Sequence, residues 1–357
     1  MVSVGNEQSS GSVATATRTV AVTGASGLVG RAVLRALAAD PTVGRVVAID
    51  LREPDTRPAG VEQCTGDILT ADLDAWFTGA DAVIHLAAIV DPIIDDSLAA
   101  QVNVVGTRRV LDAAARAGVG RIVRVASTSV YGAWPTNPRP LTEDSPLRPV
   151  PGHATAVHAA EIERTLIDWR MDHPDVTVTT LRTAPVIGRG ADHAWARVLL
   201  GPRRLRVRGA ANPVQVVHPD DLARAVLLAA STDLPGAYNV AAEGSLSADE
   251  MDALQGRASI PALPAELLTR VLTRTWSTGA GTVPPSVVPH LEHPWVVATD
   301  RLVAAGWQPR VANEEAILEA LDARTAGAAV PRWTLGALAG AVVACVGLAV
   351  IRRLRRR

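Results

Sequence analysis

Short apolar runs recur through the first half of the chain and alternate with segments whose apolar residues have helical spacing. The runs are rich in Val and Ile, as buried strands are, and cover Thr19–Val22, Arg45–Ile49, Ala82–Leu86, Arg121–Ala126 and Val176–Leu181. Between them, Leu28–Ala39 and Leu98–Ala117 have the spacing of helices packed on a sheet. This alternation predicts an α/β fold with a doubly wound parallel sheet and right-handed crossovers.

The alternation divides the chain into parts. Residues 1–17 are rich in Ser, Thr, Gly and Ala and predict a flexible arm rather than a secretory signal. Strand–helix alternation then runs through 18–187. In 188–325 proline-bearing turns separate shorter elements, which predicts a smaller substrate lobe ending in a helix at Asn313–Ala323.

Composition excludes several classes of protein. The formal net charge is −1, so no overall electrostatic field favours a nucleic-acid partner. The two cysteines cannot build a disulfide framework. The chain contains no lysine, so all 35 basic residues are arginines and any mechanism that needs a lysine is excluded.

A glycine-rich segment, TGASGLVG, follows the first predicted strand and opens the first predicted helix. Gly24, Gly27 and Gly30 would let the backbone turn tightly and approach a pyrophosphate at the helix N-terminus. Asp50 ends the next strand, 20 residues after Gly30. An acid there binds a ribose diol and repels a 2′-phosphate, which favours NAD over NADP, although an arginine two residues later could accept that phosphate. We therefore expect a Rossmann-type NAD-binding domain over 18–187.

Further short markers follow this segment in a fixed order: Gly66-Asp67-Ile68, His85-Leu86-Ala87-Ala88, Asn103 with Gly106-Thr107, Ser127–Gly132, Leu181-Arg182 with Ile187-Gly188, and Val217–Ala223. Together they resemble the extended short-chain dehydrogenase/reductases, the NAD-dependent epimerase/dehydratase family. The resemblance covers about Arg18 to Ala323. It implies an oxidoreductase or epimerase that acts on a hydroxyl or keto carbon.

The resemblance also implies which residues form the site. Ser127 occupies the catalytic Ser/Thr position and would bond the reacting oxygen. The cofactor would contact the glycine segment, the acid after the second strand, the adenine-binding pair and the fourth-strand end: Gly24, Ser26, Gly27, Leu28, Val29, Gly30, Asp50, Asp67, Ile68, Leu86, Ala87, Ala88 and Asn103. No metal ligands are expected.

The chain departs from the family at the proton-transfer pair. In the family a tyrosine exchanges the proton, and a lysine four residues later holds the nicotinamide ribose and lowers the tyrosine pKa. Here only Tyr131 and Tyr238 occur, neither in that position. The expected place is just before a predicted helix at Ala156–Met171. The helix can be aligned with the family in two registers, and in both the tyrosine and the lysine are absent. If Glu161 is the helix glutamate, His153 replaces the tyrosine and Val157 the lysine. If Glu163 is the helix glutamate, Thr155 and Ala159 replace them.

Three interpretations of this loss stay open. An atypical enzyme could use His153 with Ser127, because imidazole titrates near neutral pH. Alternatively, the chain could be a non-catalytic NAD-dependent sensor or scaffold at a membrane. The third interpretation is a proton transfer or dehydration in which NAD is only structural.

Arginines concentrate at the start of the predicted substrate lobe. Because the family often acts on nucleotide sugars, this cluster could hold a diphosphate. It could equally face anionic lipid, or reflect the abundance of arginine in the chain. The residues are Arg189, Arg197, Arg203, Arg204, Arg206 and Arg208.

The C-terminal segment predicts a membrane anchor. Trp333–Ile351 has 19 residues without a charge, which as a helix would span roughly 28 Å, close to the hydrocarbon thickness of a bilayer. Residues 352–357 form a basic tail. We expect the globular domain in the cytoplasm, with the tail either translocated or held at the interface. Small residues would also permit pairing of two copies, hence a homodimer: Gly336, Ala337, Ala339, Gly340 and Ala341.

Overall fold

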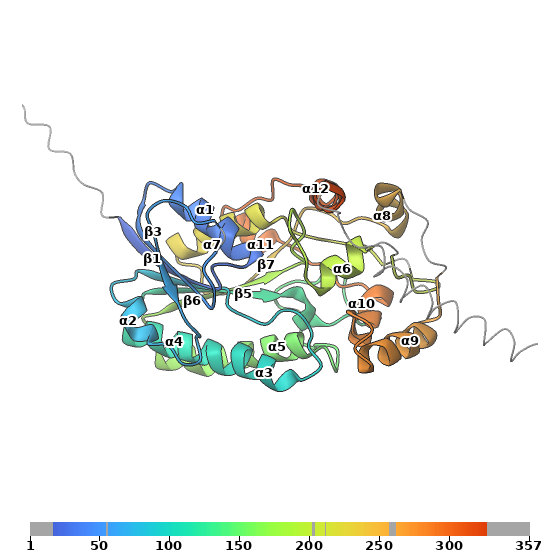
Figure 1. Ribbon diagram of the computed structural model, residues 1–357, viewed down its shortest axis with the longest axis horizontal. Coiled ribbons are helices and arrows are strands. Elements are labelled where there is room, and N and C mark those ends of the chain that lie inside the picture. The colour runs from blue at the N-terminus through green and yellow to red at the C-terminus, as the bar shows by residue number, and fades with distance from the viewer. Residues whose placement is uncertain (1–16, 55, 202–203, 211, 257–261, 327–357) are drawn as a thin grey trace, which may run out of the picture.

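A seven-stranded parallel sheet crosses the molecule in the order β3-β2-β1-β4-β5-β6-β7 (Figure 1). The computed structural model describes residues 17–326 except 55, 202–203, 211 and 257–261. The strands are β1 (Arg18–Thr23), β2 (Val43–Asp50), β3 (Val61–Thr65), β4 (Ala82–His85), β5 (Arg121–Ser127), β6 (Thr177–Thr183) and β7 (Gly236–Val240).

The predicted doubly wound parallel sheet is confirmed. All five predicted strands form, as β1, β2, β4, β5 and β6, and their ends lie within a few residues of the expected ones. The sequence did not predict β3 and β7, because VEQCT and GAYNV contain too few consecutive apolar residues to stand out.

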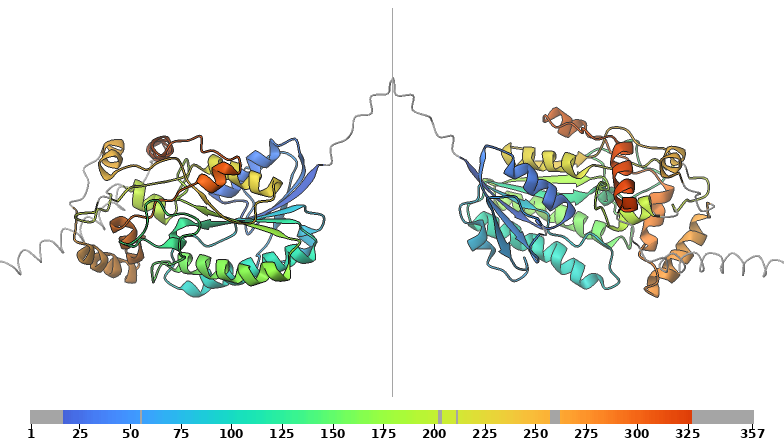
Figure 2. Two further views of the ribbon diagram at one scale, coloured as in Figure 1. Left: turned by 180° about the vertical axis from the view of Figure 1, so that it is seen from behind. Right: turned by 45° about the horizontal axis from the view of Figure 1, so that its top comes forward.

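Helices cover both faces of the sheet (Figures 1 and 2). In β1, Val20 and Val22 pack toward one helical layer and Ala21 toward the other, so both faces are apolar. The first layer contains α1 (Leu28–Ala38), α7 (Pro219–Ser231) and α11 (Asp300–Ala304). The second contains α2 (Leu73–Phe77), α4 (Thr107–Arg116) and α5 (Ala154–Asp172).

The helix expected over Leu98–Ala117 is built in three parts. It begins as α3 (Asp96–Ala100), widens into the π-helical segment η1 (Gln101–Gly106) and continues as α4. Asn103 lies in the π-helical segment. Such segments occur often at functional sites because they re-aim side chains.

A smaller lobe lies at one end of the sheet (Figures 1 and 2). Its helices pack around apolar clusters of their own. Not all of 188–325 belongs to it, because α7 and β7 return to the central sheet. The elements of the lobe are α6 (Ala194–Leu200), α8 (Ala248–Gln255), α9 (Ala265–Ser277), η3 (Pro285–Val287), α10 (Val288–Glu292) and α12 (Asn313–Ala326).

Three sequence predictions lie outside the described residues: nearly all of the arm at 1–17, the anchor at 333–351 and the basic tail at 352–357. Within the part of the chain that the structure describes, no helix has both the length and the apolar character needed to cross a bilayer.

Candidate active site

A deep cleft opens where β1, β4, β5 and β6 end, which is where ligands bind in open parallel sheets. Its empty volume is about 1450 Å³, part of it open to solvent. We call it the main cleft. The predicted site residues that line it are Gly24, Gly27, Leu28, Val29, Gly30, Leu86, Ala87, Ala88, Asn103, Ser127 and His153.

The three glycines of the first loop lie in different surroundings. Gly24 has a φ of +73°, and a Cβ there would lie 2.5 Å from the Ala87 amide nitrogen. A Cβ on Gly30 would lie 2.3 Å from the Gly24 carbonyl oxygen. At Gly27 a Cβ would approach protein only at 3.4 Å, at that same oxygen. Gly27 therefore borders open space in the main cleft, and no side chain caps the N-terminus of α1 beside it.

Asp50 braces this loop. One of its carboxylate oxygens accepts the Ser26 amide at 2.9 Å, and the other accepts the Arg52 amide at 3.3 Å. The Ser26 hydroxyl donates to the Arg52 carbonyl. Neither Asp50 nor Ser26 lines the main cleft itself; both lie at the glycine loop on the β2 side of it.

Asp67 and Ile68 also lie away from the main cleft, in the loop after β3. Asp67 accepts the Leu69 amide, and Arg109 on α4 donates to the Ile68 carbonyl. Asn103 lines the main cleft, and its amide group bonds the backbone of Ile89, donating to the carbonyl and accepting the amide. Its contribution is to hold the segment after β4 in place.

Ser127 and Tyr131 have different environments. The Ser127 hydroxyl faces the main cleft and accepts the Ser129 amide at 3.1 Å, which caps the short helix η2 (Thr128–Tyr131). Tyr131 is 1% exposed and bonds Asn239 and Arg182, each at 2.7 Å. Burial raises the pKa of Tyr131 to about 12. Tyr131 also does not line the main cleft, so it is not positioned to exchange a proton with a ligand there.

The start of α5 shows which register faces the main cleft. Thr155 and Ala159 line it, one helical turn apart, whereas Val157 is 38% exposed and points elsewhere. Glu163 is buried against Arg182, as a structural helix glutamate would be. The geometry therefore matches the register in which Thr155 and Ala159 replace the tyrosine and the lysine.

His153 lies just before α5 and still reaches the main cleft. Its ring is 5% exposed, and burial lowers its pKa to about 4, so the imidazole is neutral at pH 7. The nearest polar side chain is Ser286, whose hydroxyl lies 3.4 Å from Nδ1. The ring packs on Trp195 and His290, with centroids 6.0 and 5.3 Å away. His153 and Ser127 share the main cleft without contacting each other directly.

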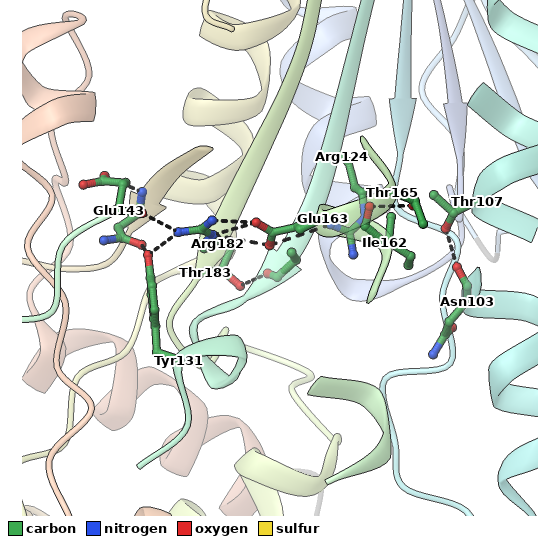
Figure 3. Close-up of polar contacts among 12 residues, drawn as sticks. Asn103, Thr107, Arg124, Tyr131, Glu143, Ile162, Glu163, Thr165, Arg182 and Thr183 are labelled. Carbon is green, nitrogen blue, oxygen red and sulfur yellow. Dashed lines mark hydrogen bonds and ion pairs between the residues drawn. The ribbon is translucent and has the colours of Figure 1, made fainter. Parts of the chain in front are cut away.

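Buried charges connect α5, β5 and β6 below the main cleft (Figure 3). Arg182 donates to both carboxylate oxygens of Glu163, with a shortest distance of 2.6 Å. Arg124 on β5 approaches the same carboxylate only to 3.9 Å. All three side chains are 7% exposed or less, so two arginines share one buried carboxylate. The sequence analysis missed Arg124, although a charge within an apolar strand is an available signal.

A second cavity of about 590 Å³, the side cavity, adjoins the main cleft, and Pro185 and Trp195 line both. Two polar groups that line it have buried atoms without a hydrogen-bond partner among the described residues: Nη1 of Arg204 and Oδ1 of Asn212. Burial lowers the pKa of His290 well below its usual value. Sequence reasoning missed Asn212, His290 and Trp195, because only tertiary packing brings them together.

Comparison with known proteins identifies the family. A model of the NAD dependent epimerase/dehydratase family matches residues 20–241. The chain belongs to this family. That result confirms the resemblance drawn from the sequence, and the family's NAD dependence confirms the predicted cofactor.

Individual relatives agree with this assignment. An uncharacterized protein of Mycobacterium tuberculosis is 29% identical over 253 residues, covering 68% of this chain and 67% of its own. A dTDP-glucose 4,6-dehydratase of Streptomyces griseus is 34% identical over 142 residues, 36% of this chain and 43% of its own. The solved structure of Thermus thermophilus UDP-glucose 4-epimerase with NAD is 25% identical, with a TM-score of 0.67 over 87% of this chain and 99% of that one.

The residues present fit a bound NAD. The open side of Gly27 and the uncapped helix N-terminus suit a pyrophosphate, and Asp50 lies beside that loop. The main cleft continues from there toward Ser127 over β4 and β5. Bound NAD supplies a hydride acceptor, so a carbinol carbon could be oxidised there while its hydroxyl proton leaves separately.

Proposed function

We propose that this family member is an NAD-dependent epimerase or dehydratase that acts on a nucleotide sugar through an atypical active site. The observation that carries the proposal is the side cavity, which joins the main cleft beside Trp195 and contains buried polar atoms that nothing in the described chain satisfies. Buried polar atoms without partners are costly, so a ligand is the natural partner for them.

The charge of the side cavity suits a diphosphate. Arg204 and Arg206 share one carboxylate, Asp252, at 3.3 and 2.6 Å. A second acid, Asp249, is 95% exposed and lies 3.8 Å from Arg206. Arg204 is the more buried of the two arginines and has the longer contact with Asp252, and guanidinium groups bind phosphate oxygens well. A sugar joined to such a diphosphate would extend past Trp195 toward Ser127.

Proton transfer must proceed without the tyrosine and lysine of the family. Ser127 is placed to hydrogen-bond the reacting oxygen, because its hydroxyl lies at the edge of the main cleft. His153 is neutral at pH 7, so one of its ring nitrogens can accept a proton, although the burial that keeps it neutral makes it a weaker base than an exposed imidazole. In this proposal a water molecule or the substrate itself carries the proton between Ser127 and His153.

Binding and turnover of the full-length protein test the proposal. UDP and dTDP are titrated by calorimetry, and the NAD-loaded protein is incubated with UDP-glucose and dTDP-glucose while products are followed by chromatography. We expect Arg204→Gln to weaken diphosphate binding about tenfold or more. Arg208→Gln, on an exposed side chain nearby, is the matched control. A wild-type protein that binds neither diphosphate contradicts the nucleotide-sugar proposal.

A second candidate is a non-catalytic NAD-dependent sensor or scaffold. The buried, high-pKa Tyr131 and the absence of lysine favour it, because the main cleft then has no strong proton acceptor. The double variant Ser127→Ala/His153→Gln separates the two. In an enzyme it abolishes turnover, whereas a sensor has no turnover to lose and keeps its NAD affinity.

We also propose that the apolar segment 333–351 anchors the protein to a membrane with its globular part in the cytoplasm. The support is its sequence alone: 19 uncharged residues followed by five arginines in 352–357. Fractionation of cells that express the full chain and a chain ending at Arg332 tests this. The full chain should sediment with membranes and the shortened chain should not; equal distributions would refute the anchor.

A further inference from the structure

Arg124 is a buried cation that the fold neutralises only in part. Its side chain is 5% exposed, and its Nη1 makes no hydrogen bond to any described residue. Among the described residues Arg124 has one ion-pair partner, Glu163, whose carboxylate is held by Arg182 at 2.6 Å and lies 3.9 Å from Arg124. Burying a charge without a close partner costs stability, so an exchange of Arg124 for an apolar residue would be expected unless the charge has a use.

Arg124 lines the main cleft, and it belongs to none of the apolar clusters on the two faces of the sheet. It lines the main cleft together with Asn103, Thr107, Ala159 and Ile162. Ala159 is the residue in the place of the family's lysine in the register that the structure supports. Its methyl group is much smaller than a lysine side chain, and Arg124 on β5 lines the same cleft.

Strand order tells which part of a dinucleotide would lie there. The glycine loop follows β1, and Asp50, the predicted ribose ligand, ends β2 on one side of it. Arg124 is on β5, on the other side of β1 and beyond β4, where His85 is its register partner. A dinucleotide with its pyrophosphate at Gly27 and its adenosine ribose at Asp50 therefore has its second ribose over β4 and β5.

We propose that the guanidinium of Arg124 holds the nicotinamide ribose of NAD by donating to its hydroxyl oxygens, replacing the missing lysine from a different element. This rests on the proposed function, since it assumes that the main cleft binds NAD. The fixed charge would also favour the deprotonated form of any nearby oxygen acid, such as the hydroxyl of a bound substrate.

Three ligands that share the ADP group test whether Arg124 contacts the second ribose. ADP lacks the second ribose, ADP-ribose contains it, and NAD adds the nicotinamide ring. We expect Arg124→Met to weaken NAD and ADP-ribose about tenfold or more, the amount lost with a charged hydrogen bond, and to change ADP less than twofold. Arg121→Met is the matched control on the same strand, because Arg121 lies at its opposite end, outside the main cleft.

Two further variants guard against loss of folding. Arg124→Lys keeps the charge and should retain most of the affinity for ADP-ribose. Arg124→Met/Ala159→Lys returns a cation at the family position and should restore it. Thermal unfolding of each variant is measured alongside.

The outcomes separate the possibilities. If wild type binds NAD but Arg124→Met binds all three ligands as tightly, or loses all three equally, then Arg124 only balances Glu163 and the inference is wrong. Failure of wild type to bind NAD would instead refute the proposed function. Recovery of ADP-ribose binding in the double variant would support the inference.

Discussion

Arg182 on β6 and Glu163 on α5 form a buried ion pair with a shortest distance of 2.6 Å, and it joins the sheet to the helix that faces the main cleft. Both side chains are 7% exposed or less. Arg182 also binds the Tyr131 hydroxyl and the Glu143 carbonyl oxygen, so one guanidinium organises three segments (Figure 3).

Removing the charge of Glu163 should destabilise the folded protein strongly. Glu163→Gln leaves Arg182 and Arg124 buried without a counter-charge, and the expected loss is about 3–5 kcal/mol of unfolding free energy. Chemical denaturation measures it. Glu161→Gln, two residues earlier and exposed, is the control and should stay within about 0.5 kcal/mol of wild type. A small effect at both positions would mean that the ion pair does not hold α5.

Two substitutions in the glycine loop should separate folding from binding. Gly27→Ala adds a methyl group that meets protein only at 3.4 Å, so stability should be nearly unchanged while NAD affinity falls about tenfold or more. Gly24→Ala forces a Cβ to within 2.5 Å of the Ala87 amide nitrogen and should lower the melting temperature. Calorimetry measures the NAD affinity, and thermal unfolding measures the melting temperature. Unchanged NAD affinity in Gly27→Ala would place the pyrophosphate elsewhere.

Asp50 should set the choice between NAD and NADP. Asp50→Asn keeps an oxygen to accept the Ser26 amide but removes the charge that repels a 2′-phosphate. We therefore expect NADP affinity to rise several-fold and NAD affinity to fall, measured by titration with both dinucleotides. If the ratio of the two affinities does not move, Asp50 acts only as a brace for the glycine loop.

Stability should fall on mild acidification because of buried histidines. Burial lowers the pKa of His153 from 6.5 to about 4, so below pH 6.5 the unfolded chain binds a proton that the folded chain does not. The contribution of neutral His153 to the unfolding free energy is complete above pH 6.5. It is lost as the pH falls toward 4, at up to about 1.4 kcal/mol per pH unit.

Urea unfolding at several pH values checks this. His153→Gln should reduce the loss between pH 7 and pH 4 by about 3 kcal/mol. His85, whose pKa burial lowers to about 3, keeps contributing in the same direction. A variant with the same pH dependence as wild type would show that the pKa of His153 is the same in the folded and the unfolded protein.

The fold could be predicted from the sequence because its signals are local. Apolar runs rich in Val and Ile and a glycine loop at a strand end depend on neighbouring residues only. The register of α5 could not be predicted, because Glu161 and Glu163 are equivalent in sequence and only the distant Arg182 selects one of them. Arg124 stands out as a charge within an apolar strand, but a strand pattern does not tell which charge lacks a close partner in the folded protein.

A chain of hydrogen bonds runs from β1 to the π-helical segment η1 through residues far apart in the sequence. It also fixes which atom carries each hydrogen. The Thr107 hydroxyl donates to the Asn103 carbonyl at 2.5 Å, so its oxygen can only accept from His85 Nε2, 2.9 Å away. His85 therefore carries its hydrogen on Nε2, and its Nδ1 accepts from the Thr23 hydroxyl at 2.8 Å. Every hydrogen along this path points from the glycine loop toward η1. A single imidazole tautomer is thus built into the fold, and its ¹⁵N chemical shifts would report any movement of the loop after β1.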